Sequence, residues 1–188
     1  MADALLNIAH TIPRSAVNGP GERFVLWVQG CTLGCPGCWN PETWSRKPQR
    51  IVHALDLADE ILTTTAIEGI TLTGGEPFQQ AAQLTPLVSR VRAVGLSVVV
   101  FTGYDLEELV TEEQQTLLLL CDVVVAGRYR KRQRSQEFGW RGSSNQQVHF
   151  LTSRYTPAAI PIASECEIHI APSGSLTLTG FPPVGLDS

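Results

Sequence analysis

The sequence lacks any long hydrophobic run. Its longest apolar stretches, such as residues 96–101, have the length of a strand and fall far short of the roughly 20 residues that cross a bilayer. Charge is also sparse, with 17% charged residues and a net charge of −4, and no internal repeat or low-complexity segment is visible. These absences give no reason to expect a membrane span, an anionic membrane surface or nucleic acid as a partner.

The start of the chain lacks the features of a secretory signal. Residues 1–6 contain an early Asp3 and no basic region followed by an apolar stretch, so we expect no such signal. The 188 residues suffice to bury one proper core, and no composition shift or long linker marks a second one. The composition therefore predicts one compact, soluble unit.

What the sequence does have is a cluster of cysteines. Cys31, Cys35 and Cys38 have the spacing C-x3-C-x2-C, in a loop with glycine and proline between them. Such a loop can turn three thiolates onto one inorganic centre, and soft sulfur ligands select iron–sulfur clusters or zinc. Three thiolates leave one iron of a four-iron cubane open to a small molecule, whereas structural zinc needs a fourth ligand, and His53 lies at no customary interval. The spacing favours a [4Fe-4S] cluster.

Two further cysteines, Cys121 and Cys166, lie far from this loop. They could form a disulfide, but a reducing cytoplasm suits an iron–sulfur cluster far better than an oxidising compartment does. We therefore expect a cytoplasmic protein in which Cys121 packs as a small buried hydrophobic residue.

Short apolar runs alternate with amphipathic ones through the middle of the chain. We expect strands at 24–29, 69–73, 97–102, 123–126 and 148–151, and helices at 56–64, 79–93 and 106–120, the last as one helix or two. This α/β alternation predicts right-handed β-α-β units and a mainly parallel sheet. Sites in such sheets gather at the carboxyl ends of the strands, where Cys31, Gly74 and Gly103 fall.

The chain after Pro157 differs in kind. Residues 165–170 and 175–179 alternate polar with apolar side chains around a Pro-Ser-Gly turn, which is typical of a β-hairpin. We therefore expect a core domain at residues 1–156 and a C-terminal β-hairpin extension at 157–188 that packs on the same domain.

A Gly-Gly-Glu-Pro run, residues 74–77, follows one predicted strand. Without side chains at two successive positions, the backbone can approach a ligand closely, and Pro77 stiffens the exit of the turn. Gly-Gly alone usually marks a plain strand-to-helix turn. Beside the cysteine loop the ligand interpretation is favoured, and Glu76 is either an acceptor inside the site or a cap of the next helix.

Together these motifs resemble the radical S-adenosylmethionine enzymes. Within that superfamily the chain is similar to the small activating enzymes of glycyl-radical proteins, above all the subgroup that acts on the anaerobic ribonucleotide reductase. The resemblance runs from about residue 14 to about residue 151, and the matching segments are 17–23, 31–38, 40–44, 73–77 and 140–146.

The resemblance implies an incomplete radical-SAM β/α barrel with a curved sheet. It also implies that Cys31, Cys35 and Cys38 ligate a [4Fe-4S] cluster and that an aromatic residue, here Trp39, lies beside the adenine of S-adenosylmethionine. The residues that it places around this cofactor are Gly37, Cys38, Trp39, Gly74, Gly75, Glu76 and Pro77.

The implied activity is reductive cleavage of S-adenosylmethionine to a 5′-deoxyadenosyl radical, which takes the α-hydrogen of a glycine on a partner protein. The partners implied are that glycyl-radical protein, most simply the anaerobic ribonucleotide reductase, and a one-electron donor such as flavodoxin or ferredoxin. Two alternatives stay open. One is a radical enzyme acting on a small molecule or another peptide, and the other is a non-catalytic iron–sulfur carrier or zinc-stapled binding module.

One concentrated positive segment stands out in this acidic chain. Five cations occur within seven residues, namely Arg128, Arg130, Lys131, Arg132 and Arg134. Such a segment is either a solvated loop or a docking surface for an acidic protein or nucleotide phosphates. No aromatic residues are interleaved in the way that would support single-stranded nucleic-acid binding.

Overall fold

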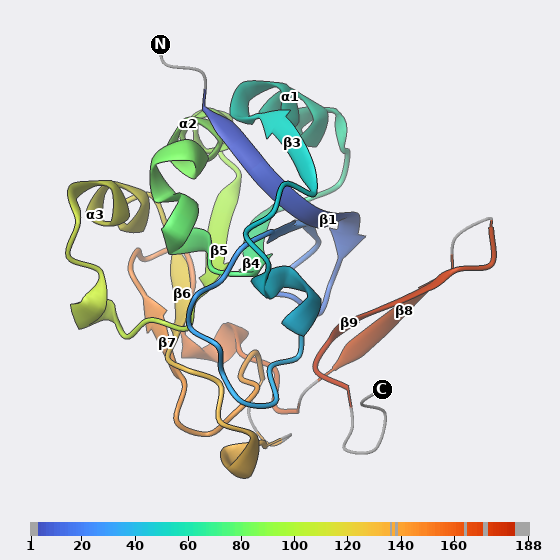
Figure 1. The fold of residues 1–188 in the computed structure, drawn as a ribbon, viewed down its shortest axis with the longest axis vertical. Helices are drawn as coiled ribbons and strands as arrows, with labels where there is room; N and C mark the ends of the chain where they lie inside the picture. The colour runs from blue at the N-terminus through green and yellow to red at the C-terminus, as the bar shows by residue number, and fades with distance from the viewer. Residues whose placement is uncertain (1–3, 136, 138, 164, 171–172, 183–188) are drawn as a thin grey trace.

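The computed structural model describes residues 4–135, 137, 139–163, 165–170 and 173–182. Its central sheet has seven strands in the order β3-β1-β2-β4-β5-β6-β7, and a separate two-stranded sheet pairs β8 with β9 (Figure 1). The strands are β1 (Leu5–Ser15), β2 (Arg23–Val28), β3 (Arg50–His53), β4 (Gly69–Gly74), β5 (Ser97–Phe101), β6 (Val123–Ala126), β7 (Gln147–Phe150), β8 (Cys166–Ile170) and β9 (Leu176–Gly180).

Among the described residues, three α-helices and five 3₁₀ turns connect these strands. They are α1 (Ala54–Thr63), α2 (Ala81–Ala93) and α3 (Glu112–Leu118), with η1 (Pro41–Trp44), η2 (Pro77–Gln80), η3 (Leu106–Glu108), η4 (Lys131–Gln133) and η5 (Pro157–Ala159). None of the helices in the described residues is long and apolar enough to span a membrane.

The centre of the sheet is parallel, as expected. Strands β2, β4, β5 and β6 are neighbours in that order and run parallel. The antiparallel pairs are β1 with β2, β1 with β3 and β6 with β7. The parallel strands come from the predicted β-α-β alternation, because a crossover helix returns the chain to the same edge each time. All four therefore end at one edge, which is where the cysteine loop and residues 74–77 begin.

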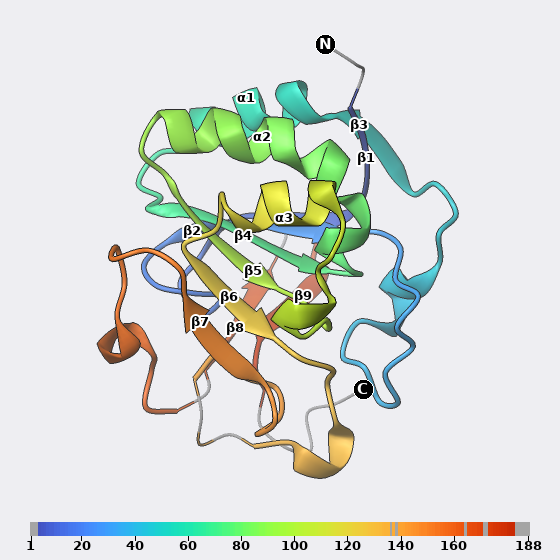
Figure 2. The same cartoon turned by 90° about the vertical axis from the view of Figure 1, so that its left-hand side faces the viewer.

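The two faces of the sheet are covered differently. Helices α1, α2 and α3 cover one face, as Figure 2 shows, and alternate residues of β2, such as Phe24 and Leu26, pack with them in the main core. The other face buries Val99, Val123 and Val125 against Trp140 and other residues from the C-terminal half of the chain. Burial on both faces explains why β2, β5 and β6 are continuous apolar runs rather than alternating ones.

Two strands were not predicted from the sequence. The first strand is β1, not residues 24–29, and β3 adds a further edge beyond it. Register shifts interrupt the pairing of β1 with β2, and β3 has mostly exposed side chains, so neither segment has a clean period of two. The predicted helices at 79–93 and 106–120 each break into a 3₁₀ turn followed by an α-helix.

A buried guanidinium fixes the amino-terminal edge of the parallel strands. Arg23, the first residue of β2, is fully buried and donates to the hydroxyls of Thr71 and Ser97 at 2.8 and 3.0 Å and to three backbone carbonyl groups. Burial lowers the pKa of Arg23 to about 10. All its donors are thus satisfied by neutral oxygens of neighbouring segments.

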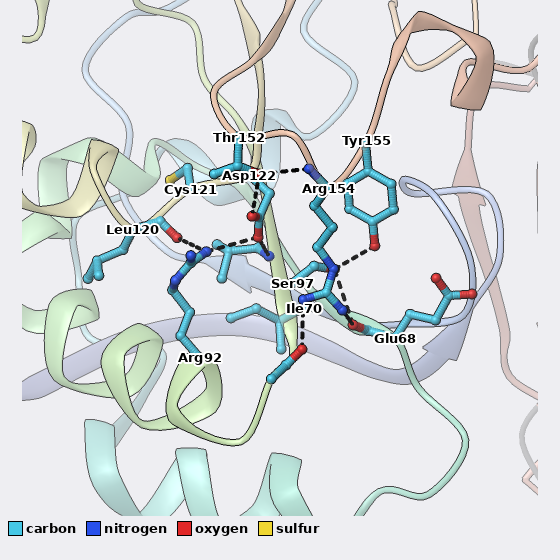
Figure 3. Close-up of polar contacts among 12 residues, drawn as sticks. Glu68, Ile70, Arg92, Ser97, Leu120, Cys121, Asp122, Thr152, Arg154 and Tyr155 are labelled. Atoms are coloured by element: carbon cyan, nitrogen blue, oxygen red, sulfur yellow. Dashed lines mark hydrogen bonds and ion pairs between the residues drawn. The ribbon is translucent and has the colours of Figure 1, made fainter.

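The same edge holds a buried carboxylate at the start of β6. Asp122 accepts from Arg92 of α2 at 2.9 Å and from the hydroxyl of Thr152 at 2.8 Å (Figure 3). It also accepts from the backbone amide of Val98 at 2.8 Å. It therefore ties β5, α2 and the segment after β7 together. Because Asp122 is almost fully buried, removing it leaves several polar groups without their partner.

We predict that Asp122→Ala lowers the free energy of unfolding of the metal-free, reduced protein by about 2–3 kcal/mol. The control is Asp59→Ala, which breaks the exposed ion pair with Arg90 and is expected to cost below about 1 kcal/mol. Urea unfolding monitored by circular dichroism measures both. Equal losses in the two variants would contradict the role assigned to Asp122.

Candidate functional site

The cysteine loop leaves the carboxyl end of β2 and is fastened at its start. Gly30 donates to the carbonyl of Thr43 at 2.7 Å and Cys31 to that of Trp44 at 3.1 Å, both in η1, so the loop closes on itself. Within it Cys38 donates its backbone amide to the carbonyl of Cys35 at 3.0 Å. The tight turn expected from the spacing is therefore present.

Each of the three thiols faces backbone amides. Asn40 donates to the sulfur of Cys38 at 3.4 Å, and amides of Leu33 and Tyr129 lie against Cys31 and Cys35 respectively, where they counteract the effect of burial. Burial nevertheless raises the pKa of Cys31 and of Cys35. Amides that point at a sulfur stabilise its thiolate, and a bound metal would favour the thiolate further.

The arrangement of the three thiols bears on the kind of metal centre that they fit. Among the described residues, no three His, Cys, Asp or Glu side chains lie close enough together to hold a single metal ion. Cys31, Cys35 and Cys38 instead all line one cavity. A cubane cluster takes one thiolate at each of three separate irons, so thiols spread around a cavity fit it better than they fit one zinc ion.

The Gly-Gly pair at the end of β4 lies against the cysteine loop. A Cβ atom added at Gly75 would overlap the carbonyl oxygen of Gly30 and lie 2.8 Å from its carbonyl carbon. The amides of Gly75 and Glu76 donate to the carbonyls of Val28 and Gly30 at 2.8 and 2.9 Å. The space saved at Gly75 is thus filled by protein backbone, a packing reason that the sequence did not reveal.

Glu76 caps η2 and also lines a cavity beside the cysteine loop. Its carboxylate accepts from the amide of Phe78 at 3.0 Å, which caps η2, from the hydroxyl of Thr102 at 2.8 Å and from the amide of Gly103 at 2.9 Å. It thereby joins the ends of β4 and β5. Burial raises the pKa of Glu76 to about 7, although these hydrogen bonds oppose the shift.

The carboxyl ends of β2, β4, β5 and β6 meet at one cavity of about 680 Å³. The predicted site residues that line it are Cys31, Cys35, Gly37, Cys38, Trp39, Gly74, Gly75 and Glu76. Pro77 is buried in the first turn of η2 and is not among the lining residues, so it shapes the turn. Gly103 lines the cavity as well, so Cys31, Gly74 and Gly103 lie around one cavity at the carboxyl edge of the sheet.

Trp39 stands between two other parts of the chain. The guanidinium carbon of Arg134 lies 4.8 Å from the centre of its ring, and the ring of Phe181 lies 5.8 Å away. Cation–π and tilted ring contacts of this kind hold an aromatic ring in one orientation. Trp39 is thus a fixed flat surface on the cavity wall.

The positive segment 128–134 divides between the site and solvent. Arg128 donates to the carbonyl of Gly103 and pairs with Glu108, while Lys131 and Arg134 line the cavity. Arg130 and Arg132 are exposed. The segment is therefore partly a wall of the site, which its charge pattern alone did not indicate.

Residues 140–146 support this wall from behind. Gln146 accepts from the amide of Gly142 at 2.9 Å and donates to the carbonyl of Gly127 at 3.0 Å, and Asn145 donates to that of Arg128 at 2.9 Å. Ser143 is buried and accepts from the amide of Arg130. These side chains mainly hold the loop after β6 in shape, although Gly142 and Gln146 also reach the cavity.

The C-terminal extension supplies lining residues that sequence reasoning missed. They are Leu178, Thr179, Gly180, Phe181 and Pro182. The predicted hairpin is present as β8 and β9. Its alternation of polar and apolar residues was visible in the sequence, but its place beside the cavity was not.

Cys121 is buried and donates to the carbonyl of Leu117, as expected for a small core residue, and all five cysteines are free thiols.

We predict that Gly75→Ala reduces the iron and sulfide bound per chain after anaerobic reconstitution to less than about half, because the new methyl group displaces Gly30 beside the first cysteine and overpacking of this kind costs about 1–3 kcal/mol. The control is Gly34→Ala within the cysteine loop, where an added Cβ meets nothing within 4 Å and only backbone strain at a φ of 58° arises. Full iron content in Gly75→Ala would contradict the packing argument.

The raised pKa of Glu76 predicts a pH dependence. Between the ordinary value of 4.5 and about 7, the unfolded chain has lost this proton while the folded chain keeps it, so the free energy of unfolding falls as pH rises through that window. We expect the free energy of unfolding of metal-free wild type to fall by about 3 kcal/mol because of this group. Urea unfolding at several pH values across this window should show the fall in the free energy of unfolding in wild type and not in Glu76→Gln. The same pH dependence in both proteins would refute the prediction.

Comparison with known proteins agrees with this site. A protein family described as a 4Fe-4S single cluster domain matches residues 17–149. An anaerobic ribonucleoside-triphosphate reductase-activating protein of Escherichia coli K12 is 38% identical over 156 residues, which cover 78% of this chain and 99% of the relative. Proteins of the same name from Vibrio cholerae and phage T4 are both 35% identical, over 78% and 76% of this chain and 99% and 93% of their own lengths.

The matched region contains the whole cysteine loop, residues 74–77 and residues 140–146, so the resemblance seen in the sequence is confirmed. The family match covers well over half of the chain, and the identity to the relatives extends over nearly their full lengths. The chain belongs to the family of anaerobic ribonucleoside-triphosphate reductase-activating proteins.

Proposed function

We propose that this chain cleaves S-adenosylmethionine reductively and uses the resulting 5′-deoxyadenosyl radical to install a glycyl radical on an anaerobic ribonucleotide reductase. The observation that carries the proposal is the single cavity into which the cysteine loop and the ends of β4 and β5 open. The names of the relatives support the reductase as substrate.

The residues present fit the cofactors that this reaction needs. Cys31, Cys35 and Cys38 would hold a [4Fe-4S] cluster, which when bound supplies the electron for cleavage of the sulfonium C–S bond. A flavodoxin or ferredoxin would deliver that electron. The reaction requires the protein to keep the reacting groups close together and away from water. The cavity at the ends of β2, β4, β5 and β6 is suited to this.

The remaining lining residues would position S-adenosylmethionine. Trp39 offers a fixed ring for the adenine, held by Arg134. Gly37, Gly74, Gly75 and Glu76 form the wall nearest the cysteines, and because the amides of Gly75 and Glu76 are bonded to the protein, carbonyl and carboxylate oxygens would face the methionine amino group. Pro77 would act indirectly by holding the turn.

The fold proposed for this activity is the partial β/α barrel of the radical S-adenosylmethionine enzymes. In support, the parallel strands β2, β4, β5 and β6 all end at the cavity. The helices α1, α2 and α3 cover one face of the sheet that these strands form. The family match at residues 17–149 and the hairpin beyond it are consistent with a core at 1–156 and an extension at 157–188.

The decisive experiment combines the reconstituted protein, S-adenosylmethionine, a one-electron reductant and the anaerobic reductase of the same organism. We expect a glycyl-radical doublet by electron paramagnetic resonance and 5′-deoxyadenosine by mass spectrometry. Cys35→Ala should abolish both signals and most of the bound iron, since a cluster ligand is lost. Cys166→Ser, in the extension, is the control and should keep them.

Two outcomes would contradict the proposal at different levels. Formation of 5′-deoxyadenosine without a doublet on the reductase would contradict the assigned substrate. A fully loaded cluster with neither product would contradict cleavage of S-adenosylmethionine.

A further inference from the structure

The C-terminal hairpin is an addition to the family pattern. The family match ends at residue 149, and 78% of this chain already spans 99% of the Escherichia coli relative. Strands β8 and β9 lie beyond that end and project from the body of the molecule (Figure 1). A two-stranded hairpin gains little stability by itself, so its contacts indicate what it is for.

One face of the hairpin attaches it to the core. Glu167 accepts from the amide of Ala16 at 2.9 Å, and the hydroxyl of Thr179 accepts from the side chain of Asn18 at 2.8 Å. Just beyond β9, the carbonyl of Pro182 accepts from Arg134 at 2.8 Å. These contacts place the base of the hairpin on the rim of the cavity.

The opposite face of the hairpin is apolar and exposed. Register pairs Ile168 with Leu178 and Ile170 with Leu176, so all four side chains point to the same side. Their exposed fractions are 63, 42, 72 and 68% in that order. We call these four residues the hairpin face. Contiguous exposed apolar side chains of this kind indicate an interaction site, whereas single scattered ones do not.

The hairpin face is continuous with the wall of the cavity. Leu178 belongs to both, and Thr179, Gly180, Phe181 and Pro182 continue the wall inward toward Trp39. A polypeptide that inserts a residue into the cavity can leave it over this rim. Its flanking residues can then cover the hairpin face, whereas a small substrate would not reach it.

We propose that the hairpin face is a docking surface for the protein whose glycine enters the cavity, the anaerobic reductase. This inference rests on the proposed function and extends it by naming the element that holds the protein substrate. To cover these exposed side chains, the partner needs an apolar strip next to the segment that carries its glycine. Docking energy would then come from the extension, while the chemistry depends on the cysteine loop and the strand ends.

The test uses the cluster-loaded full chain and the anaerobic reductase of the same organism. Ile170→Thr with Leu176→Thr removes one exposed cross-strand pair but keeps β-branched residues in the strands. The matched control is Val110→Thr with Leu119→Thr, near α3, where the exposed fractions are 77 and 81%. Calorimetry under anaerobic conditions gives the Kd for the reductase.

We expect the hairpin variant to bind the reductase about tenfold more weakly and the control to bind like wild type. Iron content and partner-independent cleavage of S-adenosylmethionine should match wild type in both variants. An equal Kd in all three proteins, or no measurable binding by wild type, would overturn the docking surface. So would loss of self-association by the hairpin variant with unchanged reductase binding, since the face would then join two copies.

Failure of this inference is distinguishable from failure of the proposed function. Hairpin-dependent binding without a glycyl doublet would support the docking surface and reject the chemistry. A doublet formed with equal Kd values in wild type and the hairpin variant would support the chemistry and reject the docking surface.

Discussion

The site depends on the close contact between the backbones of Gly30 and Gly75. Gly30 precedes the first cysteine and Gly75 follows β4, and the amides of Gly75 and Glu76 donate to carbonyls of β2 and of Gly30 itself. No side chain separates the two segments, so neither can shift without moving the other. The position of the cysteine loop over the sheet is therefore set by the parallel register of β2 and β4, not by the loop sequence alone.

Two buried charged side chains stabilise the opposite edges of the same strands. Arg23 joins the amino-terminal edge and Glu76 joins the carboxyl ends, and the hydrogen bonds of both are made with neutral groups. Burial disfavours the charged form of both side chains, so it lowers the pKa of Arg23 to about 10 and raises the pKa of Glu76 to about 7. Such groups have few alternative partners in the interior, so they favour one arrangement of the strands over others.

Local patterns predicted the parallel core and the cysteine loop because the information needed for each lies within a few residues. The spacing of three cysteines and the apolar runs of β2, β4, β5 and β6 are of this kind. Strand β1, with its register shifts, and the exposed β3 gave no clear period. The role of Gly75 depends on Gly30, and the contribution of Phe181 depends on where the extension packs, so neither could be inferred from neighbouring residues.

The positions of the tryptophans determine where the intrinsic fluorescence of the molecule originates. Three of the four indoles, Trp27, Trp39 and Trp44, line the cavity, and the fourth, Trp140, is buried on the face of the sheet that α1, α2 and α3 do not cover. Intrinsic fluorescence therefore originates largely at the site. A visible-absorbing iron–sulfur centre beside these rings would quench their emission, which makes the chain its own reporter of metal loading.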